Sequence, residues 1–342
     1  MRAAASRVAL ARFGQRPVFG SVVGIVLVFA VFTVVNFHGW WSFFTMKNIT
    51  QYAAIIGFLA LGETLVIITG EIDLSVGSVY GLAGIGFITF ARTFGVPMAF
   101  ILAMTLATAF GALNAFLCVR LRLVSMVVTL STLFLGRGII YVWTGGTSDA
   151  LSQANRVYWL TTLLGGNWLS LENGFFIFVL VVALAQTTLV ATRFGNHLLA
   201  IGGDIATAHS RGVHVARVKS AAFVLSAMLA GFSGIVTICE QPQTSVTLGD
   251  QMELEAVAAA ALGGVLLTGG RGSAIGAALG AFILTSMRYQ LINLGAPSSW
   301  YITFLGVTVI VSVIVNQRLA VAIKSLDEGM GLPEKGVGTR PA

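Results

Sequence analysis

The segment Gly70 to Ser78 (GEIDLSVGS) places two carboxylates beside a glycine-flanked break at the end of an apolar run. Charged side chains at membrane depth are costly, so they normally face a cavity or the protein interior. One interpretation is that Asp73, Ser75 and Ser78 cap and start the next helix. Gly77 would then permit close helix packing. The other interpretation is that the break borders a path, where a polar solute or water satisfies its hydrogen-bonding groups.

A second polar segment, 253–284 (ELEAVAAAALGGVLLTGGRGSAIGAALGAFIL), combines acidic residues with a small-residue helix. Glu255 faces this helix, where its carboxylate can either hydrogen-bond across helices or meet a solute. Gly263 and Gly264 begin a second glycine-rich break. We therefore place Glu255, Gly263 and Gly264 with the first break as candidates for a translocation path or a helix break.

The sequence contains no evident nucleotide-binding or catalytic motif. Residues 264–271 (GVLLTGGR) approach the phosphate-loop pattern but lack the Lys and the Ser or Thr required after the second glycine. The 4 His form no HExxH pair, and no G-x-S-x-G elbow is present. We expect no catalytic residue, no metal site and no cofactor bound by this chain.

The longest basic connection is 193–219 (RFGNHLLAIGGDIATAHSRGVHVARVK). Its centre, Asp204 to Ser210, predicts a short helix with Asp204 near the N-cap and Gly212 just beyond the end. The loop could simply be solvated and retained for orientation. A short capped helix bounded by Gly202–Gly203 and Gly212 instead favours a docking element.

The composition indicates what must position these groups. Of 342 residues, 56% are hydrophobic and only 10% are charged, whereas soluble domains carry about 25% charged residues. That balance excludes a soluble enzyme, and the 40 glycines suit close packing of transmembrane helices. Long unbroken apolar runs argue against an outer-membrane barrel. The net charge of +7 is more typical of cytoplasmic loops than of a nucleic-acid partner.

The expected fold is an all-α polytopic membrane protein in the lipid bilayer, with Gly-rich broken helices near its centre. About ten apolar segments approach the ~20 residues that a bilayer crossing needs. They fall near 17–37, 50–70, 75–91, 97–119, 124–143, 174–192, 220–239, 254–268, 274–292 and 300–316.

The distribution of basic residues predicts the orientation. If the N-terminus is cytoplasmic, most of the 20 Lys and Arg residues fall on the cytoplasmic side, and an even number of crossings returns the C-terminus there. We expect three segments: a basic cytoplasmic N-terminus (1–16), one transmembrane domain (17–317, with 193–219 as a cytoplasmic connection) and a cytoplasmic tail (318–342).

Three segments of the chain resemble the signature regions of ribose-type permeases, the membrane subunits of bacterial binding-protein-dependent ABC sugar importers. The segments are GEIDLSVGSVYGLAG, TRFGNHLLAIGGD with SRGV, and LEAVAAAALGGVLLTGGRGS with GAALGAFIL. The match runs in order through about 50–317. The family's first motif usually has Gly where Glu71 stands, so the chain departs from the family pattern there by a charged side chain.

The resemblance implies a homodimer in the bacterial inner membrane, cytoplasmic ATP-binding subunits that hold ATP and Mg, and a periplasmic or lipid-anchored solute-binding protein. It also assigns 193–219 to the region that couples the permease to the ATPase. The residues that match its recurrent positions are Gly202, Gly203, Asp204, Arg211 and Gly212.

The implied activity is import of a pentose, hexose or related monosaccharide by alternating access, driven by ATP hydrolysis in the partner. Few ionisable groups in the apolar runs suit a neutral polyhydroxylated solute. The alternatives are an ABC permease for another small polar solute (a nucleoside, an autoinducer-like sugar or a branched-chain amino acid) and an ion-coupled secondary carrier, which would place Asp, Glu or His in its core.

Overall fold

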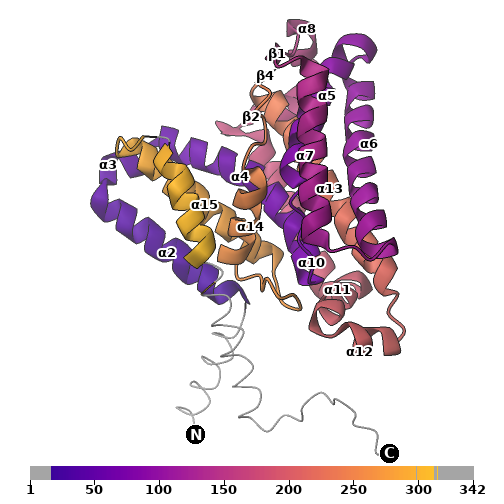
Figure 1. Cartoon of the computed structure of the whole chain (residues 1–342). Helices are drawn as coiled ribbons and strands as arrows, with labels where there is room; N and C mark the ends of the chain where they lie inside the picture. The colour runs from indigo at the N-terminus through magenta and orange to yellow at the C-terminus, as the bar shows by residue number, and fades with distance from the viewer. Residues whose placement is uncertain (1–16, 298, 312–313, 315–342) are drawn as a thin grey trace, which may run out of the picture.

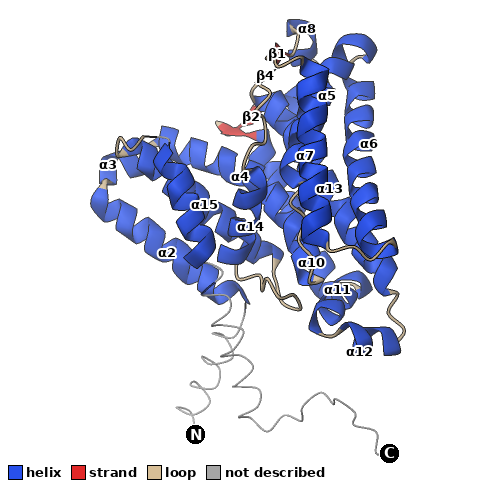
Figure 2. Cartoon of the chain, in the orientation of Figure 1, coloured by secondary structure: helices blue, strands red, loops and turns tan. Residues whose placement is uncertain are grey.

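The computed structural model describes residues 17–297, 299–311 and 314, which form an almost entirely helical chain (Figures 1 and 2). The expected N-terminal segment 1–16 and tail 318–342 lie outside the described residues. The helices are α2 (Pro17–Val35), α3 (Phe37–Trp40), α4 (Phe43–Ile68), α5 (Val76–Phe94), α6 (Val96–Ala115), the π-helix η1 (Phe116–Arg120), α7 (Ser125–Thr144), α8 (Gln153–Arg156), α9 (Trp159–Gly165), α10 (Asn173–Ala191), α11 (Arg193–Gly203), α12 (Ile205–Ser210), α13 (Val215–Glu240), α14 (Met252–Leu262) and α15 (Ala274–Asn293).

Six helical segments of the described chain are long and apolar enough to cross a membrane. They are α4, α6 with η1, α7, α10, α13 and α15. The all-α class is therefore confirmed, but the expected count of about ten is not. Two further expected crossings correspond to the shorter apolar helices Gly20–Val35 and Ser299–Val311.

The expected crossing at 254–268 differs most from the structure. Here α14 ends at Leu262 after 11 residues, about half the length that spans a bilayer. The chain then runs without helix until Ser273 caps α15 by accepting a hydrogen bond from the Gly276 amide at 3.3 Å. The glycines that follow Leu262 supply this break, because three of them, Gly264, Gly269 and Gly270, have φ between +78° and +88°.

The long helices α4 and α13 form the centre of the molecule, and α13 packs against α4, α5 and α6. Small residues make this approach possible. A methyl group on Gly62 would meet the Ser226 backbone of α13, and one on Gly234 would overlap the Tyr80 carbonyl of α5. Because lipid provides no hydrophobic force between helices, such close backbone packing is what holds the bundle together.

The two glycine-rich breaks lie against each other. One follows α4 and ends at Ser75, and the other separates α14 from α15. The Gly270 amide donates a hydrogen bond to the Ile68 carbonyl at 2.9 Å, and Gly269 lies close to Gly70. The fold thus brings together two segments that lie about 200 residues apart in the sequence.

Two short antiparallel sheets lie at the end of the molecule opposite α11 and α12 (Figure 1). They pair β1 (Asp149–Ala150) with β4 (Gln243–Thr244), and β2 (Asn167–Trp168) with β3 (Leu171–Glu172). The same end carries the ion pair between Lys47 and Glu172, at 3.0 Å. Of these strands, β4 lies in the loop between α13 and α14, which borders the cavity described next.

Candidate functional site

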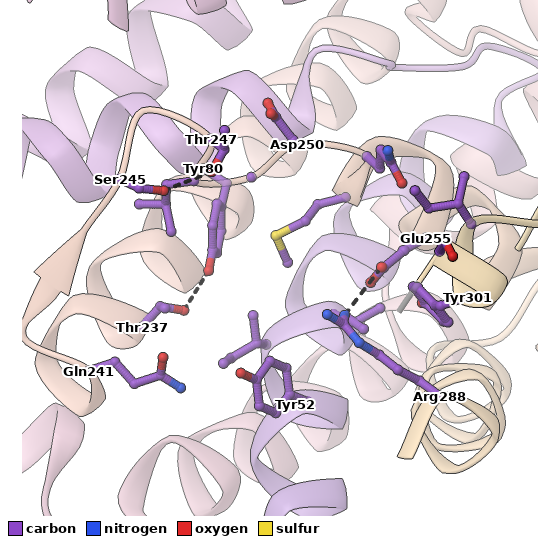
Figure 3. A pocket seen from close by; sticks show the side chains of 18 residues that line it. Tyr52, Tyr80, Thr237, Gln241, Ser245, Thr247, Asp250, Glu255, Arg288 and Tyr301 are labelled. Carbon is purple, nitrogen blue, oxygen red and sulfur yellow. Dashed lines mark hydrogen bonds and ion pairs between the residues drawn. The ribbon is translucent and has the colours of Figure 1, made fainter. Parts of the chain in front are cut away.

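A cavity of about 630 Å³ opens between α4, α5, the end of α13, α14 and α15 (Figure 3). The loop between α13 and α14 and the start of the helix Ser299–Val311 complete its wall. Its polar and aromatic lining includes Tyr52, Tyr80, Thr237, Gln241, Ser245, Thr247, Asp250, Gln251, Glu255, Arg288, Ser299 and Tyr301. We call it the outer cavity, because it lies toward the β1–β4 end of the molecule.

Neutral hydrogen-bonding groups form one side of the outer cavity (Figure 3). The Tyr80 hydroxyl donates to Thr237 Oγ1 at 2.8 Å, and the hydroxyls of Ser245 and Thr247 lie 2.7 Å apart. The Gln241 side chain is exposed beside them. These groups can donate and accept hydrogen bonds without adding a net charge to the wall.

An ion pair lies on the other side of the cavity. Arg288 Nη1 is 3.4 Å from Glu255 Oε1, and the guanidinium stands over two rings, 4.7 Å from the Tyr301 centroid and 5.5 Å from that of Tyr52. Glu255 is only 4% exposed, so Arg288 supplies the counter-charge that a buried carboxylate needs. Glu255, expected from the sequence, therefore does border a cavity.

Sequence reasoning missed the other members of this cluster. Tyr52 and Tyr301 lie on separate apolar segments with no local signal of a shared site. Arg288 did carry a signal, because it is a charged residue within the apolar run of α15. A charge at that depth is a site hypothesis by default.

The first break is held by a buried polar network rather than by solvent. Asp73 Oδ1 accepts hydrogen bonds from the Ser75 amide (3.0 Å), from Ser75 Oγ (2.6 Å) and from Asn114 Nδ2 (3.3 Å). Thr132 Oγ1 donates to Asn114 Oδ1 at 2.8 Å. The Asp73 amide in turn donates to Glu63 Oε1 at 3.0 Å. The network joins α4, α5, α6 and α7 at one point.

The expected helix start is present, with Ser75 at the N-cap of α5, but Asp73 rather than Ser75 provides the side-chain acceptor there. Ser78 Oγ donates to the Ser75 carbonyl at 2.9 Å, and Gly77 packs on Gly249. None of these four residues lines the outer cavity. The geometry supports the interpretation that these residues start α5. That they border a translocation path stays a prediction.

Glu63, Asn114 and Thr132 are members of this network that were not among the predicted site residues. Glu63 is the charged one. It lies within the apolar run of α4 and is fully buried, as is Asp73. Glu63 and Asp73 therefore place two ionisable groups together in the core. The signal was available, since a carboxylate inside an apolar helix must find partners.

The second break also packs tightly. A methyl group on Gly263 would lie 2.5 Å from the Gly276 backbone, and one on Gly280 would overlap the Ala259 carbonyl. Gly264 has φ +78°, a left-handed conformation that favours glycine. Gly263 and Gly264 are therefore the point where α14 ends and crosses α15.

The connection 193–219 contains the expected short helix. Asp204 is the N-cap of α12, and its Oδ1 accepts a hydrogen bond from the Thr207 amide at 2.6 Å. That hydrogen bond lowers the pKa of the exposed Asp204 carboxyl, because it stabilises the charged form. Arg211 follows the helix, and Gly212 has φ +83° just beyond it.

Gly202 and Gly203, the last two residues of α11, differ in the space around them. A methyl group on Gly202 would overlap the Ile68 carbonyl and the Gly270 amide, whereas one on Gly203 would meet nothing within 4 Å. The C-terminal turn of α11 is thus seated where the two helix breaks meet. Motion of α11 would therefore be transmitted directly to both breaks.

The residue that departs from the resembled motif has a specific partner. Glu71 Oε1 lies 2.5 Å from Lys219 Nζ, near the start of α13. Both side chains are mostly shielded, with 23% and 11% of their surface exposed. The charge introduced at Glu71 is therefore compensated within the chain, and it ties the first break to α13.

Comparison with known proteins places these features in a family. The family described as "Branched-chain amino acid transport system / permease component" matches residues 45–313. The "Autoinducer 2 import system permease protein LsrC" of Photorhabdus luminescens is 31% identical over 319 residues, covering 92% of this chain and 93% of the relative. That of Klebsiella pneumoniae is 34% identical over 306 residues (87% and 86%).

A third relative is the "Probable ABC transporter permease protein y4mJ" of Sinorhizobium fredii, 32% identical over 295 residues, which cover 86% of each chain. No solved structure matches the chain. The fold and the matches define a membrane permease of the ABC transporter type. The chain belongs to the permease-component family that matches residues 45–313, and it is a multi-pass inner-membrane protein.

Proposed function

We propose that the chain is the membrane-spanning subunit of an ABC importer that moves a neutral polyhydroxylated solute, a pentose, hexose or related monosaccharide. The observation that carries the solute class is the outer cavity, which combines neutral hydroxyl and amide groups with tyrosine rings. Such groups match the hydroxyls and the apolar faces of a sugar ring. The relatives named for autoinducer 2 import support a small polar solute.

The proposed topology has ten membrane crossings with both termini in the cytoplasm. The six long helices supply six crossings. The others are α2, α5, the half-length α14 with its break, and the helix Ser299–Val311. This arrangement puts α11 and α12 in the cytoplasm and the outer cavity on the periplasmic side. Two copies of the chain form the translocation unit.

The energy comes from a partner, because the chain itself has no ATP-binding motif. Cytoplasmic ATP-binding subunits would hold ATP and Mg and would dock on α11 and α12. In this scheme Asp204 and Gly212 shape α12, while exposed Gly203 and Arg211 face the partner. The seating of Gly202 on both helix breaks supports transmission from the ATPase to the membrane domain.

Affinity is proposed to reside in a periplasmic or lipid-anchored solute-binding protein, which delivers the solute to the outer cavity. The Glu255–Arg288 pair then lies within reach of the solute hydroxyls. A zwitterionic amino acid would have to separate this pair to use either charge, so the pair favours a neutral solute. Nucleosides and autoinducer-like sugars are also polar solutes that carry hydroxyl groups, so they stay alternatives to a monosaccharide.

A secondary carrier driven by protons or sodium is the second candidate. The buried Glu63 and Asp73 favour it, because proton relays place carboxylates in the core. Against it, Asp73 Oδ1 is committed to three hydrogen bonds that start α5, and neither carboxylate lines the outer cavity.

The experiment is uptake into proteoliposomes that contain the chain with its cognate ATP-binding subunit and solute-binding protein. A labelled panel of ribose, glucose, a nucleoside and leucine would be tested with ATP enclosed. We expect ATP-dependent accumulation of a monosaccharide and none with the hydrolysis-inactive ATPase. Accumulation by the chain alone under a proton or sodium gradient would overturn the proposal.

A further inference from the structure

A second cavity, of about 920 Å³, lies at the α11–α12 end of the molecule. We call it the inner cavity. Its walls come from the first break, from the linker between α6 and α7, from α12 and from the start of α13. It is separate from the outer cavity, with which it shares no lining residue. The proposed transport cycle assigns it no role.

The charge of the inner cavity is strongly one-sided. Among the described residues that line it, Glu71 is the only acidic one, and its carboxylate is already paired with Lys219. Arg122 and Arg217 also line the cavity and are exposed, and their side chains have no hydrogen bond or ion pair to any described residue. Two guanidinium groups are thus left available for an anion.

The placement of Arg122 is set by the backbone. Its φ of +58° lies in the left-handed region, which is uncommon for a residue with a side chain. Flanking hydrogen bonds hold this turn, from the Leu121 amide to the Phe116 carbonyl at 3.1 Å and from the Leu123 amide to the Leu117 carbonyl at 3.2 Å. The linker therefore presents Arg122 to the cavity without a side-chain partner.

The rim of the cavity is apolar and faces outward. Leu123, Val124 and Met126 line it and are 49%, 68% and 51% exposed, and Val127 continues the exposed surface along α7. Large exposed aliphatic side chains on a membrane-spanning helix are positions for acyl chains. A basic pocket with an apolar rim at the end of α7 complements the two parts of a phospholipid, the charged headgroup and the apolar acyl chains.

We propose that the inner cavity binds the phosphate headgroup of an anionic phospholipid, with Arg122 and Arg217 as its ligands. The acyl chains lie along the exposed face of α7 that begins at Val124. The phosphate oxygens accept charge-assisted hydrogen bonds from the two guanidiniums. Occupancy would fill the space between the first break and α12, and so stabilise the end of the molecule that carries Glu71.

The test is native mass spectrometry of the full chain in detergent, titrated with phosphatidylglycerol and, separately, with phosphatidylcholine. We expect selective binding of phosphatidylglycerol. Arg122→Gln and Arg217→Gln should each weaken it about fivefold, the effect expected of one basic residue at an anionic headgroup. Arg193→Gln is the matched control, because Arg193 is exposed at the same end but does not line the cavity.

Four outcomes would overturn the proposal. Equal binding of the two lipids would mean that the phosphate charge is not recognised. Unchanged phosphatidylglycerol binding by the double variant Arg122→Gln/Arg217→Gln would place the lipid elsewhere. Displacement of the lipid by millimolar inorganic phosphate would assign the arginines to a soluble anion. Loss of ATPase-subunit binding in the variants, with lipid binding retained, would assign the arginines to that partner. Both arginines are exposed and unpaired, so the variants should fold.

Discussion

The backbone amide of Gly270 donates a hydrogen bond to the backbone carbonyl of Ile68 at 2.9 Å. This bond joins the break after α4 to the break between α14 and α15. Gly202, at the end of α11, is seated on the same two backbones with no room for a side chain. Three segments that the sequence separates widely therefore meet at one point, where a movement of α11 would reach both broken helices.

The first prediction compares Gly202→Ala with Gly203→Ala. The added methyl group at Gly202 overlaps backbone atoms that cannot rotate away, and overpacking of this kind costs about 1–3 kcal/mol of stability. The same change at Gly203 points into open space and should be neutral, or slightly stabilising in a helix. Thermal unfolding in detergent measures both. Equal melting temperatures for the two variants would contradict the seating of α11.

Local signals explain which parts of this region could be predicted from the sequence. A capping Asp followed by a terminating glycine specified α12 because both effects act within one or two turns of the chain. The contact of Gly202 with Ile68 and Gly270 could not be predicted, since it depends on how distant helices pack. The sequence indicated a break at each site but not that the breaks touch.

The second prediction concerns the Asp204 cap and its pH dependence. The Thr207 amide lowers the pKa of Asp204 in the folded protein, so the cap is fully present above the unfolded-state pKa. Its contribution is lost as the pH falls through the lower folded-state pKa. Asp204→Asn should retain a cap that no longer depends on pH, and Asp204→Ala should lose it throughout.

Hydrogen–deuterium exchange of the 205–210 amides, corrected for the intrinsic effect of pH, would measure this difference. Wild type and Asp204→Asn should protect these amides equally at neutral pH, and Asp204→Ala should expose them. Equal protection in all three variants would show that Asp204 does not hold α12.

The third prediction concerns Glu71 and Lys219. Glu71→Gln leaves the shielded ammonium of Lys219 without its anion, which should cost about 1–3 kcal/mol of stability. The double variant Glu71→Gln/Lys219→Met should recover part of that loss, because no unpaired charge remains. The control is Arg92→Gln, which breaks the more exposed pair with Asp149 and should change little. Additive losses in the double variant would exclude coupling.

The fourth prediction concerns Glu255 in the outer cavity. Glu255→Gln keeps the size of the side chain but removes the charge that pairs with Arg288. If the carboxylate accepts a solute hydroxyl, the KM for uptake should rise about tenfold, since hydrogen bonds to charged groups contribute roughly 1.5–3 kcal/mol. Glu172→Gln, outside this cavity, should leave KM unchanged. An unchanged KM with Glu255→Gln would remove Glu255 from the solute path.

The composition of the outer cavity shows the limit of sequence reasoning more sharply. Glu255 could be predicted, because an acidic residue before an Ala-rich helix is conspicuous. Its partners Arg288 and Tyr301 come from later elements, and Tyr52 comes from α4. Hydropathy defines which segments are apolar but not which of their residues share a wall. The same reason hid the contact between Glu63 and Asp73, which lie on opposite sides of the end of α4.

The last prediction distinguishes the two interpretations of the first break by cysteine accessibility. In a background with Cys118 and Cys239 replaced by Ala, single cysteines would be placed at Ser75, Ser78 and Ser245. Ser75 and Ser78 are fully buried, so cysteines there should resist a small polar thiol reagent, whereas Ser245 is exposed in the outer cavity and should react.

The same reaction rates would be measured in the assembled transporter with and without ATP. If Ser75 and Ser78 belong only to the network that anchors α5, their cysteines should stay inert with and without ATP, while that at Ser245 should change its rate. Reaction at Ser75 or Ser78 in the ATP-bound state alone would mean that the Asp73 network opens during transport. The path would then run through the first break as well as through the outer cavity.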